Sequence, residues 1–299
     1  MSIESCTDFQ ELPEGCIANV LSLTSLKDVC RLSLVNSTFR SAAESDAIWE
    51  RFLPPDYRHI ISRSIEGADS ILAKFRTKKG LYLYLCHNHI LIDGGTKSFS
   101  LEKGTGKKCF MLASRDLFIV MGDAPEFCKW ISYPNSRFPE VAELLAVRRF
   151  EICGKINTGM LSSGTKYAAY IVFTSRSRIE GFKYQISKAS IQIGQETKQR
   201  IVCIDPDEEQ RQRCMTVPCP TFFMHQISHL CSSIDNMPAM PNARYPRLRG
   251  DGWLEVQLGE FLVKEKHDRD VKIILKEIKR GIWKSSLIIQ GIEIRPRAA

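Results

Sequence analysis

Four acidic residues in the C-terminal part of the chain are the side chains best suited to acid–base chemistry: Glu255, Glu260, Asp270 and Glu277. A glycosidase uses two such carboxyl groups, one to protonate the leaving oxygen and one to activate water or attack the sugar. Nothing in the spacing of these four acids defines such a pair, and no nucleophile elbow accompanies them. The sequence therefore predicts a protein that binds other molecules and is not an enzyme.

A second candidate for chemistry is a possible metal site formed by Cys214, Cys219, His225 and His229. The C-x4-C and H-x3-H spacings offer the four nitrogen or sulfur ligands that zinc requires. However, Cys219 and His225 are close neighbours in the chain, whereas the ligand pairs of a zinc finger are usually about 12–15 residues apart. We therefore expect reduced cysteines and histidines in a loop, with no metal and no cofactor.

A turn with the sequence GTGKK invites comparison with a phosphate-binding loop. Gly104, Gly106 and Lys107 are too close together for that motif, so a surface turn is the better interpretation. The formal net charge of +8 is spread along the chain. Nucleic-acid binding favours clustered cations with aromatic side chains between them, and we therefore expect no nucleic-acid partner.

The elements that must position any site begin with short amphipathic helices in residues 9–53. Their start signals are Pro13 at a first helical position, the capping-box pair Ser25 and Asp28, Asn36 or Ser37, and Ser45 or Asp46. So few residues rarely bury the apolar faces of several helices on one another. The remaining hydrophobic surface either packs on the rest of the chain or binds another protein.

This N-terminal segment resembles an F-box, with a Leu12-Pro13 opening, a Leu26-Lys27-Asp28 turn and a tryptophan at its end. The resemblance implies a surface that docks on the Skp-type adaptor of a cullin-based ubiquitin ligase. Spaced apolar anchors carry the binding energy in that mode of recognition. The residues that we expect to face the adaptor are Leu12, Pro13, Ile17, Val20, Leu21, Leu26, Val29, Leu34 and Trp49.

The remainder of the chain has the pattern of β-strands. Apolar and polar residues alternate in several segments, and KYAAYIVF (166–173) is apolar on both faces, as in a central strand. Gly- and Pro-bearing turns between strands predict an antiparallel, jelly-roll-like β-sandwich. The predicted α+β multidomain chain comprises a flexible N-terminus (1–8), an F-box bundle (9–55), a helical connector with a first turn and strand (56–106), and the sandwich (107–299) with a loop-rich insert (194–250).

Three blocks of this β region look like the phloem protein 2 domain, the Nictaba-like lectin fold of plants. They are KKCFMLASRDLFIVMGDAPEFCKWISYPNSRFPEVAELLAVRRFEICGKI, YAAYIVF, and LRGDGWLEVQLGEF with the ending SLIIQGIEIRPR. An F-box followed by this domain is the arrangement of the plant F-box phloem protein 2 subfamily. The resemblance implies a sandwich that binds N-acetylglucosamine oligomers or N-glycans.

The family's carbohydrate-binding positions fall on Met121, Cys128, Asp270 and Glu277, with Trp130 as a further aromatic candidate. In the active lectins, as the resemblance implies, tryptophans at the first two positions stack on the sugar. Neither Met121 nor Cys128 offers a flat ring, and losing an aromatic contact typically costs on the order of 1 kcal/mol. We therefore expect sugar binding that is weakened or altered. Trp130 is better interpreted as a buried core residue, and Trp253 is also expected in the core. Asp270 looks like a shortened version of the family's glutamate, and Glu277 is equally interpretable as a solvated charge at a strand end.

Composition agrees with a protein of the cytoplasm, the nucleus or both. The chain has 299 residues, 43% of them apolar, and 11 scattered cysteines that suggest a reducing compartment. We expect no secretory signal and no membrane-spanning segment. The leading hypothesis is a non-catalytic substrate-recognition subunit of an SCF-type ubiquitin ligase, whose partners are the adaptor, through it a cullin, and an unknown target protein or glycoprotein. The alternative is a free nucleocytoplasmic lectin.

Overall fold

The structure, a computed structural model, describes residues 12–176, 179–182, 186–205, 243–264, 268–278 and 282–297. It contains two compact units, one formed by Met1–Gly94 with Phe99–Cys109 and the other by Gly95–Ser98 with Phe110–Ala299. The expected N-terminal segment 1–8 lies outside the described residues, as do the metal-site candidates Cys214, Cys219, His225 and His229.

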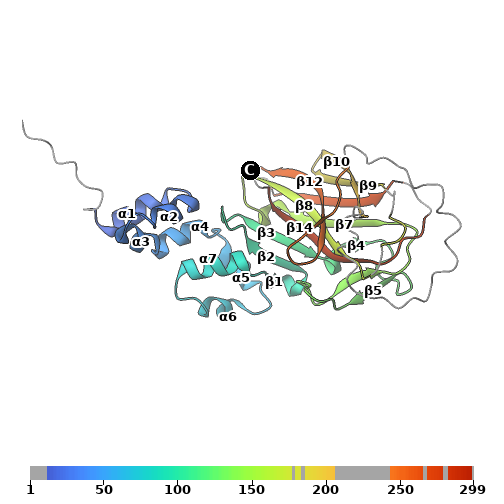
Figure 1. The fold of residues 1–299 in the computed structure, drawn as a ribbon, viewed down its shortest axis with the longest axis horizontal. Coiled ribbons are helices and arrows are strands. Elements are labelled where there is room, and N and C mark those ends of the chain that lie inside the picture. The colour runs from blue at the N-terminus through green and yellow to red at the C-terminus, as the bar shows by residue number, and fades with distance from the viewer. Residues whose placement is uncertain are drawn as a thin grey trace, which may run out of the picture. The chain divides into compact units, whose positions relative to one another are not determined.

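The first unit opens with short helices, shown in blue in Figure 1: α1 (Glu14–Ser22), α2 (Leu26–Leu32), α3 (Ser37–Ala43) and α4 (Asp46–Phe52). Side-chain caps start two of them, as the sequence predicts. Ser25 accepts the backbone N–H of Asp28 at 3.2 Å, and Asn36 accepts that of Phe39 at 2.8 Å. Ser45 holds the N-cap position of α4 without a side-chain bond.

The start of α1 differs from the expectation by one position. Pro13 is the N-cap and not the first helical residue, because its ψ of 141° is extended. Its carbonyl nevertheless accepts the N–H groups of Cys16 at 2.8 Å and Ile17 at 3.2 Å. The ring therefore fixes the chain direction just before the helix.

A second group of elements completes the first unit: α5 (Tyr57–Ser62), α6 (Ala68–Ala73), α7 (Lys78–His87) and β1 (Ile90–Ile92). The 3₁₀ turn Asp93–Gly95 leads to β2 (Lys97–Leu101), and the boundary between the units passes through β2 and β3 (Lys108–Ala113). Gly106, in the turn between these strands, has a φ of 66°. A Cβ at Gly106 would collide with the backbone carbonyl of Phe52, so this glycine of GTGKK has a structural role.

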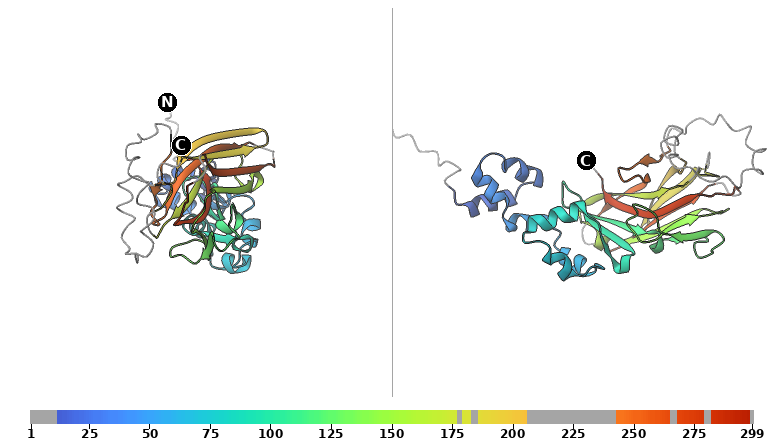
Figure 2. Two further views of the ribbon diagram at one scale, coloured as in Figure 1. Left: turned by 90° about the vertical axis from the view of Figure 1, so that its right-hand side faces the viewer. Right: turned by 60° about the horizontal axis from the view of Figure 1, so that its bottom comes forward.

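The second unit is an antiparallel sandwich whose strands form two layers (Figures 1 and 2). One sheet has the order β3-β14-β8-β12-β11, with β6 paired to β14 and β5 paired to β6; the other has the order β10-β9-β13-β7-β4. The strands are β4 (Phe118–Ile119), β5 (Cys128–Ile131), β6 (Val141–Leu144), β7 (Glu151–Asn157), β8 (Thr165–Thr174), β9 (Ile186–Ile193), β10 (Glu196–Cys203), β11 (Arg247–Leu248), β12 (Leu254–Val263), β13 (Asp270–Glu277) and β14 (Leu287–Pro296).

Glycines allow the two sheets to approach closely. A Cβ at Gly154 would lie 3.0 Å from both Leu112 and Ile292 of the opposite sheet, and one at Gly259 would lie 2.7 Å from Ile191. These contacts identify the inward face of each strand, because side chains alternate between faces. The expected central strand is β8, which pairs with β14 on one side and β12 on the other.

The start of the expected loop-rich insert is instead a strand. GQETKQR lies in the hairpin of β9 and β10, and β10 pairs in register with β9 from Glu196↔Ile193 to Cys203↔Ile186. Because β10 is an edge strand, most of its side chains are exposed and its sequence lacks an apolar alternation. Within the described part of the chain, no helix is long and apolar enough to cross a membrane.

Candidate functional site

The apolar side chains expected to face an adaptor divide into a buried and an exposed set. The buried members are at most 8% exposed and form the core of the first unit: Ile17, Leu21, Leu26, Val29 and Trp49. The indole N–H of Trp49 donates to the carbonyl of Ala43 at 2.7 Å, and its ring centroid lies 5.3 Å from that of Tyr82. These side chains hold the helices together and do not present a surface.

The exposed set lies just before α1, on α1, and in the turns that follow α1 and α2. Leu12 is 39% exposed, Val20 44% and Leu34 77%, and Pro13 is also exposed. Two residues that the sequence analysis did not single out are similarly open: Leu23 at 72% and Val35 at 64%. Isolated exposed leucines are ordinary, but this density of large apolar side chains within residues 12–35 is typical of an interaction surface.

Local hydrogen bonds fix the two turns that carry the most exposed members. Leu23 follows α1, and its N–H donates to Val20 at 3.1 Å. Leu34 and Val35 follow α2, and the N–H of Leu34 donates to Arg31 at 3.1 Å. Since the next helix begins at the Asn36 cap, both side chains are held outside the bundle core. The surface is therefore pre-formed by backbone geometry.

The second unit holds the positions expected to bind carbohydrate. Met121 lies in the turn after β4, with a φ of 62° and 48% exposure. Trp130 is half-buried, and its indole N–H donates to the carbonyl of Gly122 at 3.2 Å. The guanidinium of Arg115 lies 3.7 Å from the centre of the Trp130 ring, so this face is already occupied by a cation. Glu140 holds Arg115 in place at 2.8 Å.

Cys128 begins β5 and is only 3% exposed. Burial raises the pKa of its thiol to about 11. A thiol in this position is a small buried hydrophobic group that a sugar ring cannot reach.

Glu277 forms a buried ion pair with Lys284, whose side chain is fully enclosed. One carboxylate oxygen also accepts the backbone N–H of Phe150 at 3.2 Å. The ammonium of Lys284 donates to the carbonyls of Ile282 at 3.0 Å and Arg148 at 3.4 Å. The pair thus ties the end of β13 to the segment before β7 and to the segment before β14.

Asp270 lies at the opposite end of β13 from Glu277. The two acids are seven residue steps apart along the strand, roughly 23 Å, so one sugar ring cannot touch both. Asp270 is exposed and pairs with Lys155 at 2.6 Å, and this partner lowers the pKa of the Asp270 carboxyl. By contrast, Met121 and Glu277 lie toward the same end of their sheet, on opposite sides of β7, because the N–H of Val120 donates to Glu151 and that of Glu277 to Phe150.

A cluster of buried charges lies on the outward face of the β14-β8-β12 sheet. The carboxylate of Glu255 forms ion pairs with Arg249 at 2.7 Å and Arg295 at 2.6 Å. The carboxylate of Glu293 forms ion pairs with Arg137 at 2.7 Å and Arg249 at 2.6 Å. Burial alone would raise the pKa of Glu293, but the guanidinium groups of Arg137 and Arg249 hold it far below its usual range. These carboxylates are neutralised by arginines and are poorly suited to proton transfer.

Trp253 lies in the core, as the sequence predicts. It is 1% exposed and its indole N–H donates to the carbonyl of Asn135 at 3.1 Å. Glu260, the remaining acid considered for acid–base chemistry, is bound by Arg297 at 2.8 Å and Lys166 at 3.0 Å.

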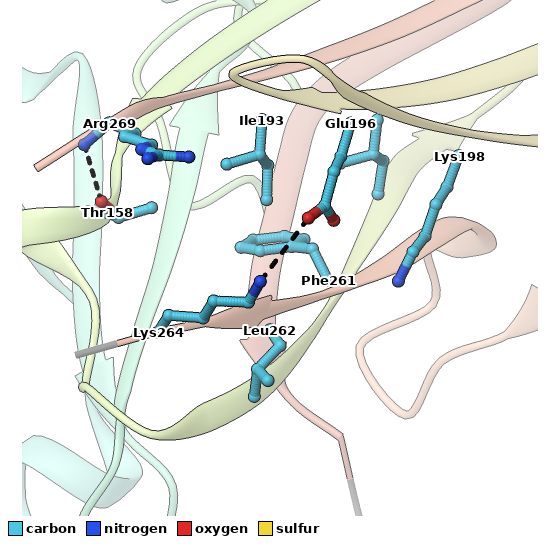
Figure 3. A pocket seen from close by; sticks show the side chains of 9 residues that line it. Thr158, Ile193, Glu196, Lys198, Phe261, Leu262, Lys264 and Arg269 are labelled. Atoms are coloured by element: carbon cyan, nitrogen blue, oxygen red, sulfur yellow. Dashed lines mark hydrogen bonds and ion pairs between the residues drawn. The ribbon is translucent and has the colours of Figure 1, made fainter. Parts of the chain in front are cut away.

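A pocket of about 180 Å³ opens where β10 lies beside β12 (Figure 3). It is lined by Thr158, Ile191, Ile193, Glu196, Lys198, Phe261, Leu262, Lys264 and Arg269. The backbone N–H of Arg269 donates to the hydroxyl of Thr158 at 2.9 Å, and Lys264 pairs with Glu196 at 3.5 Å. The sequence analysis did not identify this pocket, because its residues come from strands far apart in the chain.

Comparison with known protein families gives two matches in the order seen in the fold. The F-box domain model matches residues 9–51 and the Phloem protein 2 model matches residues 107–296. The chain belongs to the phloem protein 2 family. It is an F-box protein with a phloem protein 2 domain, as the sequence resemblance predicted.

Relatives in Arabidopsis thaliana are similar to this chain over most of their own length. F-box protein At2g02240 is 42% identical over 96% of this chain and 80% of its own, and Putative F-box protein PP2-B12 is 38% identical over 97% of this chain and 98% of its own. Among solved structures, a Podospora anserina GH26-CBM35 beta-(1,4)-mannanase matches 64% of this chain and 28% of its own. Its TM-score of 0.29 and 9% identity are too low to support an argument.

Proposed function

We propose that this F-box phloem protein 2 chain is the substrate-recognition subunit of an SCF-type (Skp/cullin/F-box) ubiquitin ligase. The observation that carries the proposal is the set of exposed apolar side chains just before α1, on α1, and in the turns after α1 and α2. F-box proteins are generally non-catalytic adaptors. In this role the first unit binds a Skp-type adaptor, and the sandwich holds the target near the ubiquitin carrier, which raises the effective concentration.

We further propose that sugar binding by the sandwich is weakened or altered. Three features support this: Cys128 is buried, Glu277 is neutralised by Lys284, and Arg115 covers a face of Trp130. An N-glycan or N-acetylglucosamine oligomer needs an open aromatic face and orienting polar groups. The alternative function as a free lectin gains no support from these positions, so we favour a protein target.

The adaptor proposal is tested by capture of a purified Skp-type adaptor on the full-length chain. Leu34→Asp places a charge on a side chain that is 77% exposed, so the fold should tolerate it. Burying a leucine contributes about 1.5–3 kcal/mol, so we expect adaptor affinity to fall at least tenfold.

The matched control is Ile65→Asp. Ile65 is 58% exposed in the same unit but lies outside the F-box, and its replacement should leave capture unchanged. Equal capture by wild type and Leu34→Asp would overturn the docking proposal. Titration with chitin oligomers tests the lectin alternative, which predicts tight binding in the absence of the adaptor.

A further inference from the structure

The pocket between β10 and β12 has an excess of positive charge. Lys198, Lys264 and Arg269 line it together with a single carboxylate, that of Glu196 (Figure 3). Glu196 pairs with Lys264. Among the described residues, no ion-pair partner faces Lys198 or Arg269. The pocket can therefore accept negative charge.

A further cation continues this row along β10. Arg200 is two residues beyond Lys198 and so lies on the same side of the strand. One of its guanidinium nitrogens, Nη1, is buried and has no hydrogen-bond partner in the part of the chain that the structure describes. Leaving a buried donor unpaired is costly, and this favours negative charge near Arg200. Burial and the nearby Arg244 lower the pKa of Arg200 more than the carboxylate of Glu260 raises it, so the positive charges around Arg200 are only partly compensated.

The size and lining of the pocket limit what can enter. Small-molecule and cofactor sites usually enclose about 300–1,000 Å³, whereas this pocket of about 180 Å³ holds only one or two side chains. Its apolar lining includes Leu262, which is 48% exposed. Phe261 is only 2% exposed and cannot offer its ring face to a sugar. The lining therefore suits acidic and apolar side chains together.

The backbone of β10 offers a second means of recognition. Its far end is bonded through Arg244, whose N–H donates to Ile201 at 3.1 Å and whose carbonyl accepts from Cys203 at 2.9 Å. Over Glu196–Arg200, no such bonds occur on this outer edge within the described residues. An edge strand of this kind can pair with an extended peptide.

We propose that an extended segment of the target protein, with alternating acidic and apolar side chains, binds along β10. Its carboxylates interact with Lys198 and the neighbouring cations, and its apolar side chains contact Leu262. This inference rests on the proposed function as a substrate receptor and identifies the class of target. Charge complementarity selects the segment, and backbone pairing holds it extended.

The test is fluorescence anisotropy with the full-length chain and a labelled peptide of alternating glutamate and leucine. A peptide of alternating glutamine and leucine is the uncharged probe, and a single-stranded oligonucleotide of equal charge is the anionic one. We expect preferential binding of the glutamate peptide, weakened by added salt. Lys198→Glu replaces an attraction by a repulsion and should weaken binding roughly tenfold.

Lys272→Glu is the matched control, because Lys272 is exposed on β13 of the same sheet, on the outward face. It should change the affinity less than twofold. The inference would be overturned if both peptides bound equally well, or if the two variants weakened binding equally. It would also be overturned if the oligonucleotide bound more tightly than the glutamate peptide and Lys198→Glu weakened that binding. Adaptor capture separates this outcome from failure of the proposed function: Lys198→Glu should leave capture intact, and Leu34→Asp should leave peptide affinity intact.

Discussion

The buried Glu277–Lys284 pair gives the sharpest test of whether Glu277, an expected carbohydrate-binding residue, instead stabilises the fold of the sandwich. Lys284 is fully enclosed, and its ammonium is bound by the carboxylate and by the carbonyls of Ile282 and Arg148. In Lys284→Met, the carboxylate of Glu277 remains buried without its charge partner. Breaking a buried pair in this way costs about 3–5 kcal/mol. For a domain of this size, the sandwich should melt roughly 6–20 °C lower.

The assay is thermal and urea unfolding followed by tryptophan fluorescence, since Trp253 is buried in the same unit. The double variant Glu277→Leu with Lys284→Met removes both charges and should recover most of the lost stability. If Glu277 served only to bind carbohydrate, its replacement would leave the melting temperature unchanged. If Lys284→Met unfolds like wild type, then the structural role assigned to the pair is refuted.

Three further predictions concern single side chains of the sandwich. Cys128 should react with iodoacetamide at pH 8 at least tenfold more slowly than the exposed Cys16. Burial raises the pKa of the Cys128 thiol to about 11, so the unfolded chain loses this proton first and the free energy of unfolding, measured by urea titration, should fall as the pH rises from about 9 to 11. Glu293→Gln should flatten the acid side of the stability profile, because a carboxyl with a lowered pKa stabilises fully above about pH 4.3 and loses that contribution as the pH falls further. Arg115→Ala should uncover the ring of Trp130 and raise affinity for chitin oligomers a few-fold by calorimetry; unchanged affinity would exclude the ring as a platform.

The helical unit could be predicted well from the sequence because its signals are local. Caps such as Ser25 and Asn36 act over three residues, and the structure places each where the pattern predicted. What the sequence did not supply was the division between core and surface. Leu21 and Leu34 are chemically identical, yet one is fully buried and the other is 77% exposed, because only the packing of the helices decides which faces are covered.

The sandwich could be predicted only in its apolar strands. β8 and β14 carry long hydrophobic runs that predict strands. The polar sequence of β10 predicts a loop instead, because an edge strand needs few apolar residues. The roles of charged residues were less accessible still. Neither the pairing of Glu277 with Lys284 nor the pocket at Lys198 follows from spacing, since each depends on strands brought together by the topology.

The two ends of β13 show why an acid at an expected binding position is weak evidence for a ligand. Glu277 is required where it stands by the buried ammonium of Lys284, and Asp270 is held at the surface by Lys155. An ion-pair partner within the chain accounts for each of these acids, and the two lie too far apart to bind the same sugar ring. The uncompensated charge of the sandwich lies instead along β10, where neither Lys198 nor Arg200 forms an ion pair with another described residue, although Glu260 acts on Arg200 from nearby. Uncompensated charge attracts a partner of opposite charge more strongly than charge that is already paired. We therefore expect the target to bind at the edge strand β10 and not at Asp270 or Glu277.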